Sequence, residues 1–249
     1  MEQGTRVATE RLWLTEPRRA TCLAKVVAVR GPAFALDRSL YAPASVLHRH
    51  PQQGDLGTVW LTGEKRVLLR SFLAGGVLWH QLRGTVPAVG EQAQCQLDVG
   101  RRLLASRAHT AMHLLLAALY RANAPPMVRN PEVRGGGTFR LDLAAPVEPR
   151  LLASCLAQAR QWATEDRPVA REHLARGHEA KVLDAQRFHP PDPYPGPATV
   201  LDVAAIRGVC SYPCDGTHVE RTGKVGNLVV AQAQATRSGF TVVAKVGST

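Results

Sequence analysis

The sequence predicts an α+β protein whose N-terminal part is built from strands alone. From Thr9 to Leu97, short apolar runs alternate with glycine, proline and charged residues, a pattern typical of a small β-barrel or sandwich. From Asp98 onward, long helical patterns and strands follow one another irregularly, which favours an α+β arrangement. We therefore expect a β-domain over residues 1–97 and an α+β domain over residues 98–249.

Apolar segments of the first part are predicted to be strands, because turn-forming residues separate them at short intervals. Arg30 to Pro32 and Ala74 to Gly76 are the clearest of these turns. The segment from Tyr41 to Asp55 contains Pro43 and Pro51 and is expected to be a loop. The predicted strands are Cys22–Val29, Ala33–Leu36, Gly57–Leu61, Val67–Leu69 and Val77–His80.

Two helices are predicted in the second part. Leu103–Tyr120 is a run of strong helix formers, and the prolines within Asn123–Pro126 must end it. Pro149–Glu165 carries apolar residues at helical spacing, which predicts one buried face. That face is expected to consist of Leu152, Cys155, Leu156, Ala159 and Trp162 or Ala163.

The other elements of the second part are short. We expect a strand at Thr138–Leu143, a short helix at Glu179–Phe188 and a proline-rich loop at His189–Pro197. A strand at Val200–Ile206 leads toward Cys214. The predicted elements end with a hairpin of Asn227–Ala235 and Gly239–Val246.

The composition points to a basic protein of a reducing compartment. A net charge of +11 and a pI near 10.1 indicate either an arginine-rich proteome or a polyanionic partner such as nucleic acid. The five cysteines are odd in number and show no disulfide spacing. No stretch reaches the roughly 20 apolar residues of a membrane span, and the first residues are polar. We expect a cytoplasmic protein that does not insert into membranes.

Two histidines lie in the first predicted helix. His109 and His113 share one face of this helix, because a helical turn takes about 3.6 residues. Two imidazoles one turn apart can bind the same metal ion. A pair of buried, hydrogen-bonded core histidines, or a half-exposed helix face, is the alternative interpretation.

Cys214 and His218 repeat this spacing later in the chain, on either side of the turn-forming Asp215 and Gly216. Such a turn can direct both side chains to one ion, or it can be a tight turn that happens to carry them. Together, the two pairs predict a tetrahedral site of three histidines and one cysteine. A thiolate combined with imidazoles selects zinc over magnesium or calcium.

Two rival interpretations of these residues are weaker. In helical zinc proteases a glutamate follows the first histidine as general base, but this chain has Thr110 there, which excludes that activity. Cys210 is a second possible sulfur ligand. It ranks below Cys214 because it lacks the turn that leads to His218.

With these motifs, the chain resembles the AlaX proteins, free-standing relatives of the editing domain of alanyl-tRNA synthetase. The resemblance extends from Thr9 to Val246. Its most specific motifs are Arg107-x-His109-Thr110-Ala111-x-His113, Cys214-x-Gly216-Thr217-His218-Val219 and Asp98-x-x-Arg101-Arg102. Weaker matches are Leu36 to Tyr41 followed by x-Pro43, Asp55-x-Gly57 and Arg140-Leu-Asp142.

The resemblance implies a small N-terminal β-barrel, a two-layer α+β editing domain and a zinc ion held by His109, His113, Cys214 and His218. It also implies a trans-editing deacylase. Such an enzyme hydrolyses the ester that links a wrong amino acid to the 3′ adenosine of a tRNA, so misacylated tRNA is the expected partner. For the family the usual substrate is seryl- or glycyl-tRNA for alanine.

Departures from the family concern the residues around the metal. The family's glycine-rich loop, which ends in glutamine, is replaced after Pro43 by a longer and bulkier segment, in which Gln52 or Gln53 takes the place of that glutamine. This change favours a threonine-like or non-proteinogenic amino acid, such as a fluorinated threonine, as alternative cargo. Asp215 replaces a common glycine. We count it with the four ligands as a catalytic residue, because its carboxylate can bind the substrate's α-ammonium group or a ligating histidine.

Two other functions fit the same residues. The chain can be a tRNA-binding module whose zinc is only structural, which predicts salt-sensitive RNA binding without turnover. It can also be a zinc hydrolase of small aminoacyl esters or amides, although the high positive charge argues against that.

Overall fold

The computed structural model describes residues 8–44, 52–122, 128–175, 200–214, 216–237 and 239–247. The chain divides into two compact units, one of residues 1–46 and 53–102 and one of residues 47–52 and 103–249. The division falls inside helix α2 (Val99–Arg121), between Arg102 and Leu103. The domain boundary expected after Leu97 stays a prediction.

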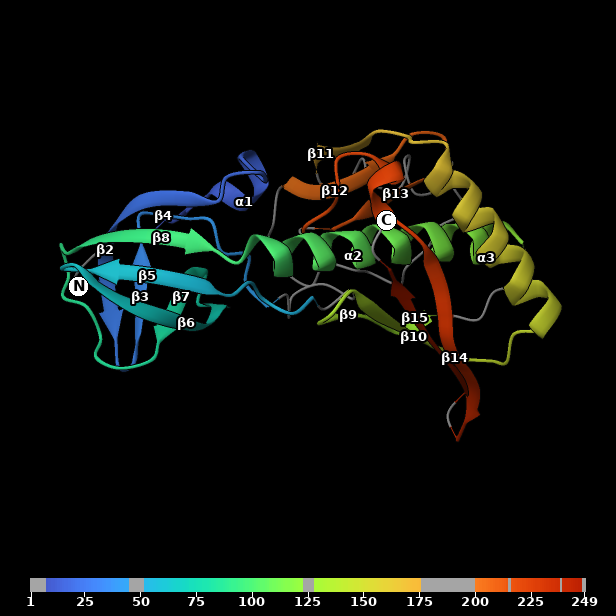
Figure 1. Ribbon diagram of the computed structural model, residues 1–249, viewed down its shortest axis with the longest axis horizontal. Helices are drawn as coiled ribbons and strands as arrows, with labels where there is room; N and C mark the ends of the chain where they lie inside the picture. Colours follow the sequence, from blue (N-terminus) through green and yellow to red (C-terminus); the bar gives the residue numbers. More distant parts are fainter. Residues whose placement is uncertain are drawn as a thin grey trace. The chain divides into compact units, whose positions relative to one another are not determined.

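The first unit contains a closed six-stranded barrel (Figure 1), as the sequence predicts. Alternating side chains of β8 point into the barrel and are buried, for example Cys95 and Leu97. The prediction, which was based on runs of apolar residues, omitted β8 because its apolar residues alternate with glutamines. The strands, in their order around the barrel, are β2 (Thr21–Arg30), β3 (Ala33–Leu36), β7 (Val77–Leu82), β6 (Glu64–Ala74), β5 (Gly57–Leu61) and β8 (Gln92–Leu97).

A buried ion pair lies in this unit, between Asp55 and Arg102. The Arg102 Nε donates to Asp55 Oδ1 at 2.8 Å, and Asp55 Oδ2 accepts the Ala42 N–H at 2.6 Å. A second Arg102 nitrogen donates to the Leu40 carbonyl at 2.6 Å. Leu40, Tyr41 and Ala42 are buried, so residues of three family motifs, around Tyr41, Asp55 and Arg102, meet in the interior of this unit.

Further short elements accompany the barrel. β1 (Glu10–Arg11) pairs in parallel with β4 (Arg38–Ser39), and α1 (Leu12–Thr15) follows β1 directly. Trp13 of α1 is buried. These pieces are too short for periodicity to reveal.

The second unit is mixed α+β, and its helices share one hydrophobic core with a sheet. Besides α2, it contains α3 (Pro149–Thr164), whose buried residues are those predicted, except that Leu156 is half-buried. The four-stranded sheet has the order β14 (Leu228–Thr236), β15 (Gly239–Val246), β10 (Thr138–Leu143) and β9 (Val128–Arg134). Figure 1 shows α2, α3 and this sheet in the same part of the molecule. The predicted fold class is confirmed.

A three-stranded sheet completes this unit, with the order β11 (Val169–Ala175), β12 (Val200–Ile206) and β13 (Cys210–Pro213). β13 separates the predicted strand Val200–Ile206 from Cys214, so the chain reverses once more before the metal motif than expected. The short 3₁₀ helix Thr222–Val225 follows that motif. The helix expected at 179–188 and the loop expected at 189–197 lie outside the described residues. Within the described ranges, no helix is long and apolar enough to cross a membrane.

Candidate metal centre

Helix α2 provides two of the predicted ligands and Thr110. His109, Thr110 and His113 are all completely buried, in a helix segment where alanine and leucine surround them. The rings of His109 and His113 lie 4.9 Å apart between centroids, at an angle of 83°. The helix therefore presents both imidazoles on one face, as the spacing predicts.

The segment after β13 provides the other two predicted ligands. Cys214 is buried and His218 is partly buried. Arg171 of β11 fixes this segment, since its guanidinium donates to the carbonyl oxygens of Cys214 at 3.2 Å and of Gly216 at 2.6 Å. Asp215, which we expected to contribute a carboxylate, lies outside the described residues, and its role stays a prediction.

Gly216 brings this segment directly against helix α2. A Cβ atom at position 216 would lie 2.5 Å from His109 Nδ1 and 2.8 Å from Gln52 Oε1, closer than real Cβ atoms come to other heavy atoms. Only glycine fits there. The glycine of this motif is thus explained by close approach of the backbone to a histidine ring.

The four predicted ligands converge on one point. Their donor atoms all lie within 4.8 Å of one another, so the group can hold a metal ion. Cys214 Sγ is 3.4 Å from His109 Nε2 and 3.3 Å from His218 Nε2. The rings of His109 and His218 are 4.3 Å apart, and those of His113 and His218 are 4.8 Å apart.

These separations fit a zinc ion. With ordinary Zn–S and Zn–N bond lengths, a tetrahedral site places sulfur and nitrogen about 3.5 Å apart. The two sulfur–nitrogen distances are 3.4 and 3.3 Å. Three imidazoles with one thiolate are also donors that zinc prefers over hard cations. The geometry and the chemistry of the donor set therefore agree.

Gln52 is a further residue of this centre. Its carboxamide Oε1 accepts the Thr217 backbone N–H at 3.0 Å and lies 3.0 Å from His109 Nδ1. Its Nε2 donates to Thr217 Oγ1 at 2.7 Å. The sequence left open whether Gln52 or Gln53 stands where the family has its glutamine. Gln52 is the one that contacts His109, whereas Gln53 accepts a hydrogen bond from Arg101 in the other unit.

Thr110 also contacts a predicted ligand. Its Oγ1 lies 3.2 Å from His218 Nδ1, 3.3 Å from the Val219 backbone nitrogen and 3.0 Å from the Ser106 carbonyl oxygen. Thr110 thus makes hydrogen bonds to the backbone, and it also supports the histidine of the second motif.

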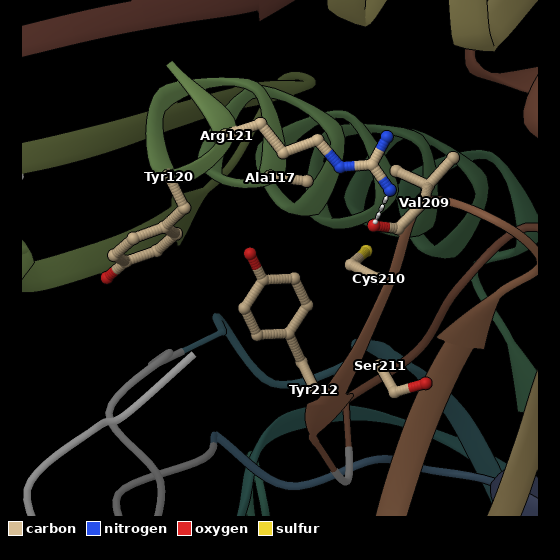
Figure 2. A pocket seen from close by; sticks show the side chains of 7 residues that line it. All are labelled: Ala117, Tyr120, Arg121, Val209, Cys210, Ser211 and Tyr212. Atoms are coloured by element: carbon tan, nitrogen blue, oxygen red, sulfur yellow. Dashed lines mark hydrogen bonds between the residues drawn. The ribbon is translucent and has the colours of Figure 1, made fainter. Parts of the chain in front are cut away.

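Cys210, the rival sulfur ligand, does not belong to the group of donor atoms that the described residues form. It lines a small cavity of about 10 Å³ together with residues of α2 and β13 (Figure 2). Such a volume holds about one water molecule and no amino acid. Arg121 closes one side, donating to the carbonyl oxygens of Gly208 and Val209 at 2.9 Å each. Burial raises the pKa of the Cys210 thiol, so it stays protonated.

Tyr212 connects this cavity to the metal centre. Its ring meets that of His113 edge to face, with centroids 4.7 Å apart. The tyrosine is almost completely buried, and burial raises its pKa well above the ordinary value. The Tyr212 side chain therefore stays uncharged and packs against His113, one of the predicted ligands.

The chain is similar to alanine–tRNA ligases. It is 27% identical over 236 residues to the enzyme of Korarchaeum cryptofilum and 27% identical over 241 residues to that of Methanopyrus kandleri. Each match covers 93% of this chain and 25% of the relative. The mitochondrial alanine–tRNA ligase of Rattus norvegicus is 26% identical over 208 residues, covering 76% of this chain and 21% of the relative. The chain thus spans about a quarter of the length of the first two. No protein-family model matches it.

Sequence reasoning missed Arg171 and undervalued Thr110. No local pattern around Arg171 distinguishes it from the other arginines, because its partners are two carbonyl oxygens more than 40 residues away. Thr110 directly follows a ligand, and that position was a usable signal. A hydroxyl at this position can contact the segment that packs against the histidines, as Thr110 does with His218 and Val219.

Proposed function

We propose that the chain is a zinc-dependent trans-editing deacylase. It hydrolyses the ester that joins a wrong amino acid to the 3′ adenosine of a tRNA. The observation that carries this proposal is the convergence of His109, His113, Cys214 and His218 in a chain that matches alanine–tRNA ligases over 93% of its length. The relatives act on tRNA by name, and a centre that can bind metal is suited to ester hydrolysis.

The four side chains would hold the ion, which when bound would supply Lewis acidity toward the ester carbonyl. The chain's own residues would shape the surroundings. Among the four ligands, only Cys214 would carry a negative charge, as a thiolate. The buried histidines of α2 would exclude water from that side of the centre. Asp215, next to Cys214 in the sequence, would bind the α-ammonium group of the amino acid.

The net charge of +11 supports a polyanionic substrate. Lysine and arginine side chains neutralise phosphates and release counterions, which favours binding of an acceptor stem over a small neutral ester. We therefore propose misacylated tRNA as the partner and the cytoplasm as the location. By the family resemblance, seryl- and glycyl-tRNA for alanine come first, and threonyl-like or fluorinated-threonyl species follow because of the altered loop.

A tRNA-binding module with a structural zinc is the second candidate. The observation that favours it is the donor set itself, since zinc sites with four protein ligands are usually closed and structural. In that case the chain binds tRNA, and the metal only stabilises the fold.

One experiment separates the two functions. The purified protein is incubated with tRNA charged with serine, glycine, threonine and fluorothreonine, and the released amino acid is measured together with RNA affinity. The deacylase predicts release of at least one amino acid, and its loss in a folded His109→Ala variant that still binds tRNA. Intact aminoacyl-tRNA throughout the panel, with salt-sensitive binding, supports the structural-zinc module instead.

A further inference from the structure

The hydrogen bonds of Gln52 and Thr110 determine which ring nitrogen of His109 and His218 carries the proton. A neutral imidazole has one N–H and one lone pair, and only the nitrogen with the lone pair can bind a metal. Each ring offers Nε2 to Cys214 and Nδ1 to another residue. The partner at Nδ1 therefore decides whether Nε2 is available.

At His109 the chain of hydrogen bonds starts from a backbone group. The Thr217 N–H can only donate, so the Gln52 atom 3.0 Å from it must be the carbonyl Oε1. The same Oε1 lies 3.0 Å from His109 Nδ1 and cannot donate a proton. His109 must then carry its proton on Nδ1, which leaves the lone pair of Nε2 facing Cys214 Sγ.

At His218 the same reasoning applies to the hydroxyl of Thr110. The Ser106 carbonyl oxygen, 3.0 Å away, can only accept, and it takes the single hydroxyl proton. The Val219 N–H can only donate, and it uses one lone pair of Oγ1. The remaining lone pair faces His218 Nδ1 at 3.2 Å, so this nitrogen must be the donor.

We propose that Gln52 and Thr110 are positioning residues that hold His109 and His218 as Nδ1–H tautomers, so that both Nε2 lone pairs point at one shared ion. The two come from separate parts of the chain but act alike: each is a neutral oxygen that accepts from Nδ1. This inference rests on the proposed metal centre, whereas the tautomers themselves exist in the metal-free protein. Partners of this kind typically change metal affinity by about 10- to 100-fold.

Two matched pairs of variants test the proposal by metal affinity. Thr110→Val keeps the shape of the side chain but removes the acceptor, and Thr110→Ser keeps the hydroxyl. Gln52→Leu removes the acceptor, and Gln52→Glu keeps two acceptor oxygens. We expect zinc affinity, measured by competition with a chromogenic chelator, to fall about 10- to 100-fold in the first member of each pair. The zinc affinity of the second member of each pair should differ from that of the wild type by no more than a few-fold. Equal affinity within both pairs overturns the proposal, even where the wild type binds zinc.

A second measurement reads the tautomers directly. Long-range ¹H–¹⁵N spectra of the histidine rings are recorded on the metal-free protein at about pH 8, above the ordinary histidine pKa. We expect His109 and His218 to show the Nδ1–H pattern, with His109 losing it in Gln52→Leu and His218 losing it in Thr110→Val. An Nε2–H pattern at either ring in the wild type overturns the inference. This readout is independent of zinc, so it distinguishes a failure of the tautomer assignment from a failure of the metal site. Thermal unfolding of all four variants identifies any that do not fold.

Discussion

Cys214 Sγ lies 3.4 Å from His109 Nε2, although 105 residues separate the two in the sequence. His109 lies in helix α2, and Cys214 directly follows strand β13. The contact joins a weakly polar thiol to a polar imidazole, and both groups are buried. A metal ion shared by the two, as we propose, would give this arrangement a physical reason.

The role of Cys214 can be separated from that of a neighbouring cysteine. In Cys214→Ser, the softest ligand is lost, and we expect bound zinc to fall from about one ion per chain to a small fraction of that. Cys210→Ser is the matched control, since Cys210 is also buried but lies outside the donor group. Elemental analysis of both purified proteins decides the matter. Zinc retained in Cys214→Ser, or lost equally in Cys210→Ser, would contradict the assignment.

The close approach of Gly216 to helix α2 makes a second prediction. An added Cβ in Gly216→Ala would collide with the His109 ring and with Gln52 Oε1, and both neighbours are buried. Such overpacking typically costs about 1–3 kcal/mol and shifts the side chains involved. We expect a lower thermal midpoint and weaker zinc binding.

Gly100→Ala is the control for this substitution. Gly100 lies in the first turn of α2, and the nearest atom to an added Cβ there is Asp98 Oδ1 at 3.6 Å, an ordinary contact. Alanine is the better helix former by up to about 1 kcal/mol. The control should be neutral or slightly stabilised, with unchanged zinc content. Equal thermal midpoints and zinc contents of Gly216→Ala and Gly100→Ala would contradict the close contact of Gly216 with His109 and Gln52.

The sequence was sufficient to single out the four side chains whose donor atoms the structure brings together, because each pair is local. Helical spacing links His109 to His113, and one turn links Cys214 to His218. The residues that form hydrogen bonds with these predicted ligands can lie far from them in the sequence. Gln52 reaches His109 and Thr217 across 57 and 165 residues, and only the fold determines that Gln52 rather than Gln53 does so.

In the barrel too, sequence patterns predicted some strands but not the contacts between residues far apart in the chain. Strands with apolar residues in consecutive positions, such as Ala33–Leu36, were predicted from sequence. β8 was not, because Gln92, Gln94 and Gln96 alternate with its buried residues and leave it without a run of consecutive apolar residues. The buried pair of Asp55 and Arg102 was visible only as a family motif. Its structural role follows from hydrogen bonds to backbone groups that no pattern specifies.

Arg171 is predicted to maintain the segment that carries two ligands. Its guanidinium bridges the carbonyl oxygens of Cys214 and Gly216, and hydrogen bonds to charged groups contribute about 1.5–3 kcal/mol each. Arg171→Leu should loosen this segment and weaken zinc binding, measured by chelator competition. Arg134→Leu is a fair control, because Arg134 forms an ion pair with the half-exposed Glu132 and such surface pairs contribute little. Equal affinities of the two variants would exclude the proposed role of Arg171.

The buried His80 makes the stability of the barrel depend on pH. It is completely buried, hydrogen-bonded to Ser39 Oγ at 2.9 Å and packed near the rings of Phe34 and Tyr41. Burial disfavours the charged imidazolium and lowers the pKa of His80 from 6.5 to about 4. The folded state therefore binds fewer protons than the unfolded state between these values. Stability is fully present above pH 6.5 and is lost as the pH falls toward 4, by up to about 3 kcal/mol.

Fluorescence can isolate this effect in the barrel. Three of the four tryptophans, Trp13, Trp60 and Trp79, belong to the first unit, so a Trp162→Phe background reports on that unit alone. Urea unfolding is measured from about pH 7 to pH 4 with and without His80→Gln, which keeps a polar group near Ser39 but does not titrate. The histidines of the metal centre are common to both proteins, so they cancel in the comparison. We expect the stability of the parent to fall more steeply on acidification than that of His80→Gln. Parallel pH profiles would mean that His80 is not the group that titrates.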